Sequence, residues 1–218
     1  MEAFVRHTGI AAPMLHNNID TDAIIPSAEM KRVSRRGLGE GLFAGWRYLR
    51  PGGREPNPEF ILNQPGYSSA SIILAGSNFG CGSSREHAVW ALREFGIRAI
   101  IAPSFGSIFQ ANCVRNGLLP IVLDETLVQS LAAAITGEPA GHPLTIDLEQ
   151  QTIGLEGHGT TPFPVEASDR HTLLEGLDLI DQTLARASSI EDFEQRDRTA
   201  RPWIYLANNP GTSGAGPD

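Results

Sequence analysis

Residues 78–88 read Asn78-Phe-Gly-Cys-Gly-Ser-Ser-Arg-Glu-His-Ala88, and this stretch decides how the centre of the chain folds. It follows an apolar run, Ser71-Ile-Ile-Leu-Ala75, which is typical of a buried strand. It leads into apolar residues spaced as on one face of a helix: Ala88, Ala91, Leu92 and Phe95. Glycines, two serine hydroxyls and a guanidinium therefore lie where a strand turns into a helix.

Such a junction can bind an anion, because free backbone N–H groups and the positive end of the helix dipole point the same way. Glycine lets the backbone approach a ligand closely, and Arg85 offers a planar fork that fits a carboxylate or phosphate. The same residues also spell a capping box, Ser83-x-x-Glu86, in which the serine caps the helix and the glutamate bonds back. The two interpretations are compatible, and the sequence leaves both open.

The surrounding pattern predicts the fold class. Apolar strands at 98–102 and 118–123 alternate with helical patterns that end at Gly96, at Asn116-Gly117 and at Gly137. This alternation implies a parallel sheet and an α/β fold. The flanks look different: we expect short strands at 4–6 and 10–15, a hairpin over 144–148 and 152–155, and a strand at 163–166. We also expect a helix that Ser168 caps and that runs to Leu174, and helices over 177–186 and 189–197. We expect one domain over residues 1–200 and a flexible tail over 201–218.

Residues 27–60 form a basic, glycine-rich stretch with little pattern. A long stretch of this kind inside a compact domain is often a functional loop, although a surface excursion would look the same. The apolar residues within it, Leu42, Phe43, Trp46 and Tyr48, predict that part of it packs.

Composition excludes several classes of function. The chain has 218 residues, a net charge of −8 and an isoelectric point near 5.2, so nucleic acid and anionic membranes are poor partners. It has no apolar run long enough for a membrane span and no signal-peptide core, which predicts a cytoplasmic protein. Two cysteines, and six histidines without a metal-ligand spacing, predict that this chain binds no metal by itself.

Three segments carry a family resemblance: Asn18-Ile-Asp-Thr-Asp22, the stretch 78–88, and Ile101-Ala-Pro-Ser-Phe-Gly-Ser-Ile-Phe109. Together they resemble the small subunits of 3-isopropylmalate dehydratase, in the aconitase superfamily, over residues 4–193. The resemblance implies a swivelling β/β/α domain like the mobile fourth domain of aconitase. It also implies a separate large subunit that carries a [4Fe–4S] cluster, a small dicarboxylate substrate, and packing roles for both cysteines.

The same resemblance assigns roles to single residues. Ser83 matches the catalytic base of aconitase, acting as an alkoxide, and Arg85 matches an arginine that holds a substrate carboxylate. Ser84 matches a substrate-binding neighbour, while Glu86 is expected to cap the helix and His87 to pack. Asp22 would support the base or an arginine, or would only form an Asx-turn. Arg35 would touch the substrate, with Val33 or Leu38 lining its isopropyl group, although Arg36 departs from the threonine common in the family.

Three other interpretations stay open. The chain could be the small subunit of a related hydro-lyase: a homoaconitase, a citraconate or methylmalate hydratase, or a dimethylmaleate hydratase. It could be a nucleotide-binding module, although its glycines fit neither the Gly-x-Gly-x-x-Gly nor the Gly-Lys-Ser/Thr pattern. It could also be a regulatory subunit without catalytic residues.

Overall fold

The computed structural model describes residues 1–31, 36–138, 141–157 and 159–205. The chain divides into two compact units, Met1–Asp178 and Leu179–Asp218. The single domain expected over residues 1–200, with a flexible tail after it, stays a prediction, and residues 206–218 lie outside the described ranges.

The larger unit is built on a four-stranded parallel sheet in the order β2-β3-β4-β5 within the described residues. Its strands are β2 (Ala11–Met14), β3 (Ile72–Ala75), β4 (Ala99–Ala102) and β5 (Leu119–Val122). Every residue of β3 and β4 is buried, because both faces of the sheet are covered. The parallel pairing expected from the alternating strands and helices is confirmed.

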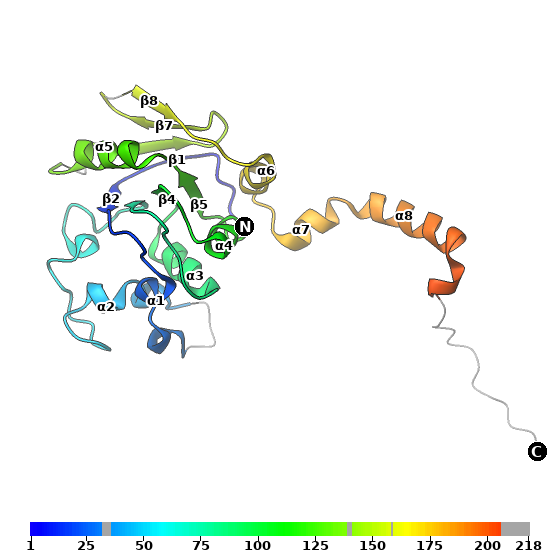
Figure 1. Ribbon diagram of the computed structural model, residues 1–218, viewed down its shortest axis with the longest axis horizontal. Helices are drawn as coiled ribbons and strands as arrows, with labels where there is room; N and C mark the ends of the chain where they lie inside the picture. The colour runs from blue at the N-terminus through cyan, green and yellow to red at the C-terminus, as the bar shows by residue number, and fades with distance from the viewer. Residues whose placement is uncertain (32–35, 139–140, 158, 206–218) are drawn as a thin grey trace, which may run out of the picture. The chain divides into compact units, whose positions relative to one another are not determined.

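Alternate residues of these strands enter two separate hydrophobic cores. Ile73 and Ile100 belong to one core, while Ile72 and Ile101 belong to the other. The first core receives the helices on one side of the sheet, visible below it in Figure 1: α1 (Thr21–Ile24), α2 (Ala44–Arg47), α3 (Glu86–Phe95) and α4 (Ser107–Arg115). Short 3₁₀ turns complete this side: η1 (Ser27–Lys31), η2 (Gly39–Gly41) and η3 (Ile61–Asn63).

The second core receives α5 (Glu125–Ile135), α6 (Ala167–Glu175) and a second, antiparallel sheet (Figure 1). That sheet has the order β1-β6-β7-β8, with the strands β1 (Arg6–Gly9), β6 (Leu144–Asp147), β7 (Thr152–Leu155) and β8 (Gly159–Pro162). Burial alternates along β6 and β7, so only one face of this sheet points to the core. The hairpin expected over 144–155 is confirmed.

Three flank predictions are wrong. The strand expected at 4–6 lies instead over Arg6–Gly9. Residues 163–166 are not a strand, because the third strand of this meander is β8, immediately before them. Helix α6 begins after Glu166, so Ser168 lies inside it and does not cap it. In the stretch 27–60, Leu42 and Phe43 are buried, as expected for a segment that partly packs.

The smaller unit is helical: α7 (Leu179–Leu184), α8 (Ala187–Ala200) and the 3₁₀ turn η4 (Pro202–Tyr205). Asp197 of α8 accepts hydrogen bonds from Arg201 Nε, at 2.6 Å, and from Tyr205 Oη, at 2.7 Å. These contacts tie η4 back onto the end of α8.

Candidate active site

Three segments meet at the carboxyl ends of the strands: the segment after β2, the loop after β3 and the segment after β4. Gly80 N–H donates to the Ile19 carbonyl at 2.7 Å, which joins the segment after β3 to the segment after β2. Phe79 N–H donates to the Ser104 carbonyl at 3.0 Å, which joins the same loop to the segment after β4. In parallel sheets the crevice outside these carboxyl ends is where ligands bind. The three motifs that lie far apart in the sequence therefore form one cluster.

Asparagines link the first two segments. Asn18 and Asn78 both adopt left-handed backbone angles, with φ of 59° and 61°. Asparagine tolerates this conformation better than most residues with a side chain. Asn78 Nδ2 donates to Asn18 Oδ1 at 2.8 Å, and Ser77 N–H donates to Asn17 Oδ1 at 2.8 Å. The sequence analysis gave no role to these asparagines. The signal that could have found them is the recurrence of asparagine in the segments that follow two strands, at Asn17-Asn18 and at Asn78.

Glycines allow the close packing at this junction. Gly80 has φ of +72°, and a Cβ atom there would lie 2.2 Å from the ring of Phe109. A Cβ atom on Gly106 would lie 2.6 Å from the Gly80 carbonyl oxygen. The glycine turn therefore packs directly on the start of α4, as well as leading into α3.

Ser83, Ser84 and Arg85 lie at the amino end of α3. Both serines are exposed, and within the part of the chain that the structure describes neither hydroxyl has a hydrogen-bond partner. Arg85 is the residue before the first turn of α3, and its Nη1 donates to Asp22 Oδ1 in a short ion pair. The arginine side chain is 22% exposed and the aspartate side chain 55% exposed. Of the two supporting roles expected for Asp22, the structure shows the contact with an arginine.

The expected capping box is wrong. Among the described residues no side chain caps α3, and the residue at the cap position is Arg85, not Ser83. Glu86 instead accepts a hydrogen bond from Asn116 Nδ2 at 2.8 Å, because the end of α4 packs beside the start of α3. The Ala88 N–H donates to the Arg85 carbonyl at 3.1 Å, so among the described residues the N–H groups of Glu86 and His87 and the Ser83 hydroxyl are available to a ligand.

Asn116 makes hydrogen bonds to residues of both α3 and α4, behind the two serines and Arg85. Besides Glu86, its Nδ2 donates to the Asn112 carbonyl at 2.9 Å, and its Oδ1 accepts from Trp90 Nε1 at 3.0 Å. The ring of His87 lies 4.8 Å from the Trp90 ring, so His87 packs as expected. One side chain thus joins the start of α3 to the end of α4.

We predict that Asn116→Ala lowers the free energy of unfolding by about 1–3 kcal/mol, because partly buried polar partners lose their hydrogen bonds. Chemical denaturation of the isolated chain measures this change. The control is Gln129→Ala on α5, whose amide makes one exposed bond to Glu125, and its effect should stay within about 0.5 kcal/mol. Equal effects of the two substitutions would contradict the role given to Asn116.

The residues expected around the isopropyl group have mixed outcomes. Arg35 and Val33 lie outside the described residues. Leu38 is only 1% exposed and belongs to the core, so the expectation that it lines the substrate is wrong. The segment after residue 35 is fixed from α3: Gly37 N–H and Gly39 N–H donate to the two carboxylate oxygens of Glu94, at 2.6 and 2.8 Å.

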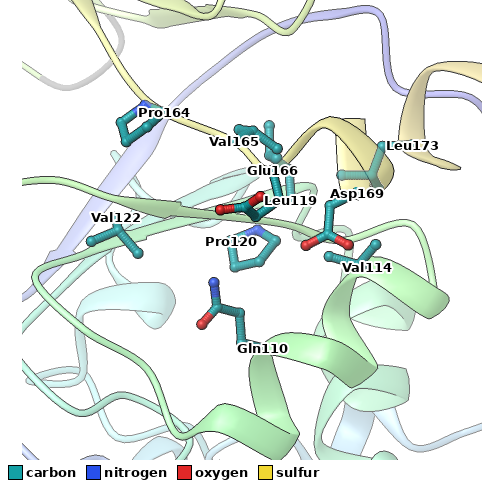
Figure 2. Close-up of a pocket in the computed structure, with 10 residues that line it drawn as sticks. All are labelled: Gln110, Val114, Leu119, Pro120, Val122, Pro164, Val165, Glu166, Asp169 and Leu173. Carbon is teal, nitrogen blue, oxygen red and sulfur yellow. The ribbon is translucent and has the colours of Figure 1, made fainter. Parts of the chain in front are cut away.

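A cavity of about 240 Å³ lies elsewhere, between α4, β5 and α6 (Figure 2). Figure 2 shows the carboxyl groups of Glu166 and Asp169 and the amide of Gln110 around a largely aliphatic wall. Burial, together with the neighbouring Glu166 carboxylate, raises the pKa of Asp169. None of the residues that line this cavity comes from the three meeting segments, so it is separate from the candidate site: Gln110, Val114, Leu119, Pro120, Val122, Pro164, Val165, Glu166, Asp169 and Leu173.

Among residues 1–31, 36–138, 141–157 and 159–205, no group of three His, Cys, Asp or Glu side chains is placed to hold a metal ion. Cys113 is buried between α4 and the sheet, and burial raises the pKa of its thiol well above the usual range. These donors do not fit an iron–sulfur cluster, which takes three or four thiolates. No helix in the described ranges is both long and apolar enough to cross a bilayer.

Comparisons with known proteins agree with this geometry. The model of the aconitase C-terminal domain matches residues 1–126, and that of the C-terminal domain of the 3-isopropylmalate dehydratase small subunit matches residues 180–206. The 3-isopropylmalate dehydratase small subunit of Cupriavidus necator is 61% identical over 206 residues, 94% of this chain and 99% of that protein. The corresponding protein of Agrobacterium fabrum is 51% identical, over 93% of this chain and 100% of its own length.

A solved structure extends the comparison. A 3-isopropylmalate dehydratase from Methanocaldococcus jannaschii superposes with a TM-score of 0.60 at 27% identity, covering 87% of this chain and 99% of that one. The two-sheet fold is therefore that of the aconitase C-terminal domain, and the expected β/β/α class is confirmed. The chain belongs to the family of 3-isopropylmalate dehydratase small subunits.

Proposed function

We propose that this chain is the small subunit of a cytoplasmic 3-isopropylmalate dehydratase, which interconverts 2-isopropylmalate and 3-isopropylmalate during leucine biosynthesis. The observation that carries the proposal is the pair of Ser83 and Arg85 at an uncapped helix start, with Asp22 holding the guanidinium. The reaction is inferred from membership of the family, and the exposed polar groups are where we propose that it takes place.

The reaction moves a hydroxyl group between adjacent carbons. A proton leaves the carbon beside one carboxylate while hydroxide leaves the neighbouring carbon, which gives an unsaturated diacid and water. Water then adds back with the opposite orientation. The chemistry needs a base at the carbon, fixed counter-charges for two carboxylates, and an acid for the leaving hydroxide.

This chain supplies the base and one counter-charge. Ser83 would take the proton as an alkoxide, and the positive charge of Arg85 and the amino end of α3 both favour an anionic oxygen there. The Arg85 guanidinium would bind a substrate carboxylate in place of Asp22. Asp22 lies at the surface, so its ion pair with Arg85 can open when the substrate binds. Ser84, exposed beside them, would add a hydrogen bond to the substrate. Arg35 remains a proposed substrate contact.

The two cysteines of this chain are too few for an iron–sulfur cluster, so a cluster that acts as the acid would be held by a partner. We propose a large subunit that holds a [4Fe–4S] cluster, whose open iron would supply Lewis-acid chemistry at the hydroxyl group. The proposed base, Ser83, is exposed and the proposed clamp, Arg85, is partly exposed on the small subunit, as required if the partner completes the site.

The test is reconstitution of the isolated chain with its large subunit. We expect no dehydration of 2-isopropylmalate by the isolated chain, and full turnover when the two subunits are mixed, followed by the absorbance of the unsaturated diacid. A panel of substituted malates should show preference for the isopropyl compound. Activity of the isolated chain would contradict the partner, and preference for methylmalate, dimethylmalate or homocitrate would point to a related hydro-lyase.

A further inference from the structure

Thr21 connects two elements that the sequence separates by about sixty residues. Its side chain is buried, with 1% of its surface exposed. Its backbone N–H donates to the Cys81 carbonyl at 3.0 Å, and its Oγ1 donates to the Ser83 carbonyl at 2.9 Å. A parallel bridge between Asp20 and Cys81 aligns the two segments. The start of α1 therefore runs beside the loop that carries the proposed base.

The neighbours of Thr21 have different contacts. Asp20 caps its own helix, with Oδ1 accepting from Ala23 N–H at 2.7 Å. Asp22 accepts from Arg85. In the Asp-Thr-Asp sequence the first residue thus holds α1, the second holds the backbone at Ser83, and the third holds the arginine.

We propose that Thr21 is the positioning residue that fixes the Ser83 hydroxyl for proton transfer, an inference that rests on the proposed function. The Ser83 carbonyl accepts two hydrogen bonds, from Thr21 Oγ1 and from Arg85 N–H at 2.8 Å. Two donors restrict the plane of the peptide that follows Ser83, and with it the direction of the Ser83 Cα–Cβ bond. Among the described residues the hydroxyl itself has no partner, so the backbone, and not a side-chain bond, determines where this side chain starts.

The role needs the hydroxyl group of Thr21 and not only its volume. Because Thr21 is buried, it cannot touch the substrate, so it acts through Ser83. Valine has nearly the same shape and would keep the packing, but it would leave the Ser83 carbonyl with only the Arg85 bond. The loop would then sample more orientations, and a misplacement of about 1 Å can cost roughly 10²-fold in rate.

The experiment compares Thr21→Val and Thr21→Ser in the assembled enzyme. We expect Thr21→Val to lower kcat by roughly 10-fold to 10²-fold with little change in KM, because Arg85 keeps its own anchor. Thr21→Ser should restore most of kcat. Thr136→Val is the matched control. The Thr136 Oγ1 donates to the Ala132 carbonyl at 2.7 Å at the end of α5, and loss of this hydrogen bond should leave kcat unchanged. If Thr21→Val does not fold, Thr21→Ala serves the same comparison.

A double-mutant cycle separates positioning from an independent contribution. In a Ser83→Ala background, Thr21→Val should cause no further loss, because the group that it positions is already absent. An equal further loss would overturn the proposal, as would a rise in KM alone, or a failure of Thr21→Ser to restore kcat.

Hydrogen exchange of the isolated chain gives a readout that does not depend on activity. Thr21→Val should speed the exchange of the Arg85 amide, the one amide of the segment 83–85 with a hydrogen bond among the described residues, while Thr136→Val should not. Unchanged exchange in that segment would overturn the positioning role even if Ser83 is catalytic. Faster exchange together with a fully active Ser83→Ala enzyme would instead contradict the role of Ser83 in the proposed function, and with it the catalytic part of this inference.

Discussion

Replacing Ser83 with alanine is expected to lower kcat of the assembled enzyme by roughly 10²–10⁴-fold, the usual range for losing an acid–base group. The substitution removes one exposed oxygen that has no partner among the described residues, so the fold should be unaffected. The affinity for the large subunit and the KM should change little. Steady-state turnover with saturating large subunit measures the effect.

Two serines provide controls for this experiment. Ser84→Ala removes the adjacent hydroxyl and should reduce activity less, because only a substrate hydrogen bond is lost. Ser130→Ala removes a hydroxyl that donates to the Thr126 carbonyl on α5, far along the chain from the site, and should be silent. Near-normal turnover by Ser83→Ala would show that the base lies elsewhere and would favour a regulatory subunit.

Replacing Arg85 with glutamine should lower kcat/KM by roughly 10²–10³-fold, comparable to removing one donor from a preorganised anion site. The substitution removes a positive charge both from the substrate carboxylate and from the neighbourhood of the Ser83 alkoxide. Arg85→Lys should lie between this variant and the unmodified enzyme, because lysine keeps the charge but cannot make two parallel hydrogen bonds. Kinetics over a range of substrate concentrations would separate the KM and kcat parts.

Arg98→Gln is the matched control for Arg85. Arg98 also pairs with a surface carboxylate, Glu2, but it lies at the amino end of β4, the opposite end of the strand from the site. Its substitution should leave kcat/KM unchanged. If Arg85→Gln stayed within threefold of the unmodified enzyme while Ser83→Ala was inactive, the substrate carboxylate would have to be bound by another cation.

Local pattern predicted much of the larger unit. The apolar runs at 71–75 and 98–102 became β3 and β4, and Gly96 ends α3 in a left-handed conformation, as expected. These features follow from burial on both faces and from backbone freedom, which neighbouring residues largely determine. The motif around Ser83 and Arg85 was also found from spacing and residue type.

Other predictions were wrong or incomplete because contacts between distant segments decided the outcome. Glu86 had the spacing of a capping residue, but the amide of Asn116 competes for its carboxylate once α4 packs beside α3. Leu38 was expected to line the substrate, but packing of the core buries its side chain. Thr21 was not assigned a function at all, because its partners at Cys81 and Ser83 are remote in the chain.

The sequence by itself determined the α/β class, the glycine turn that leads into α3, and the residue types of the proposed anion site, because these depend on periodicity and on local backbone preferences. The tertiary structure alone decided that the turn after β2, the loop after β3 and the segment after β4 meet, and that β1 pairs with β6 far along the chain. Strand order and pairing are set by how the whole chain buries its apolar faces. The neighbours of Ser83 therefore cannot be read from the residues beside it in the sequence.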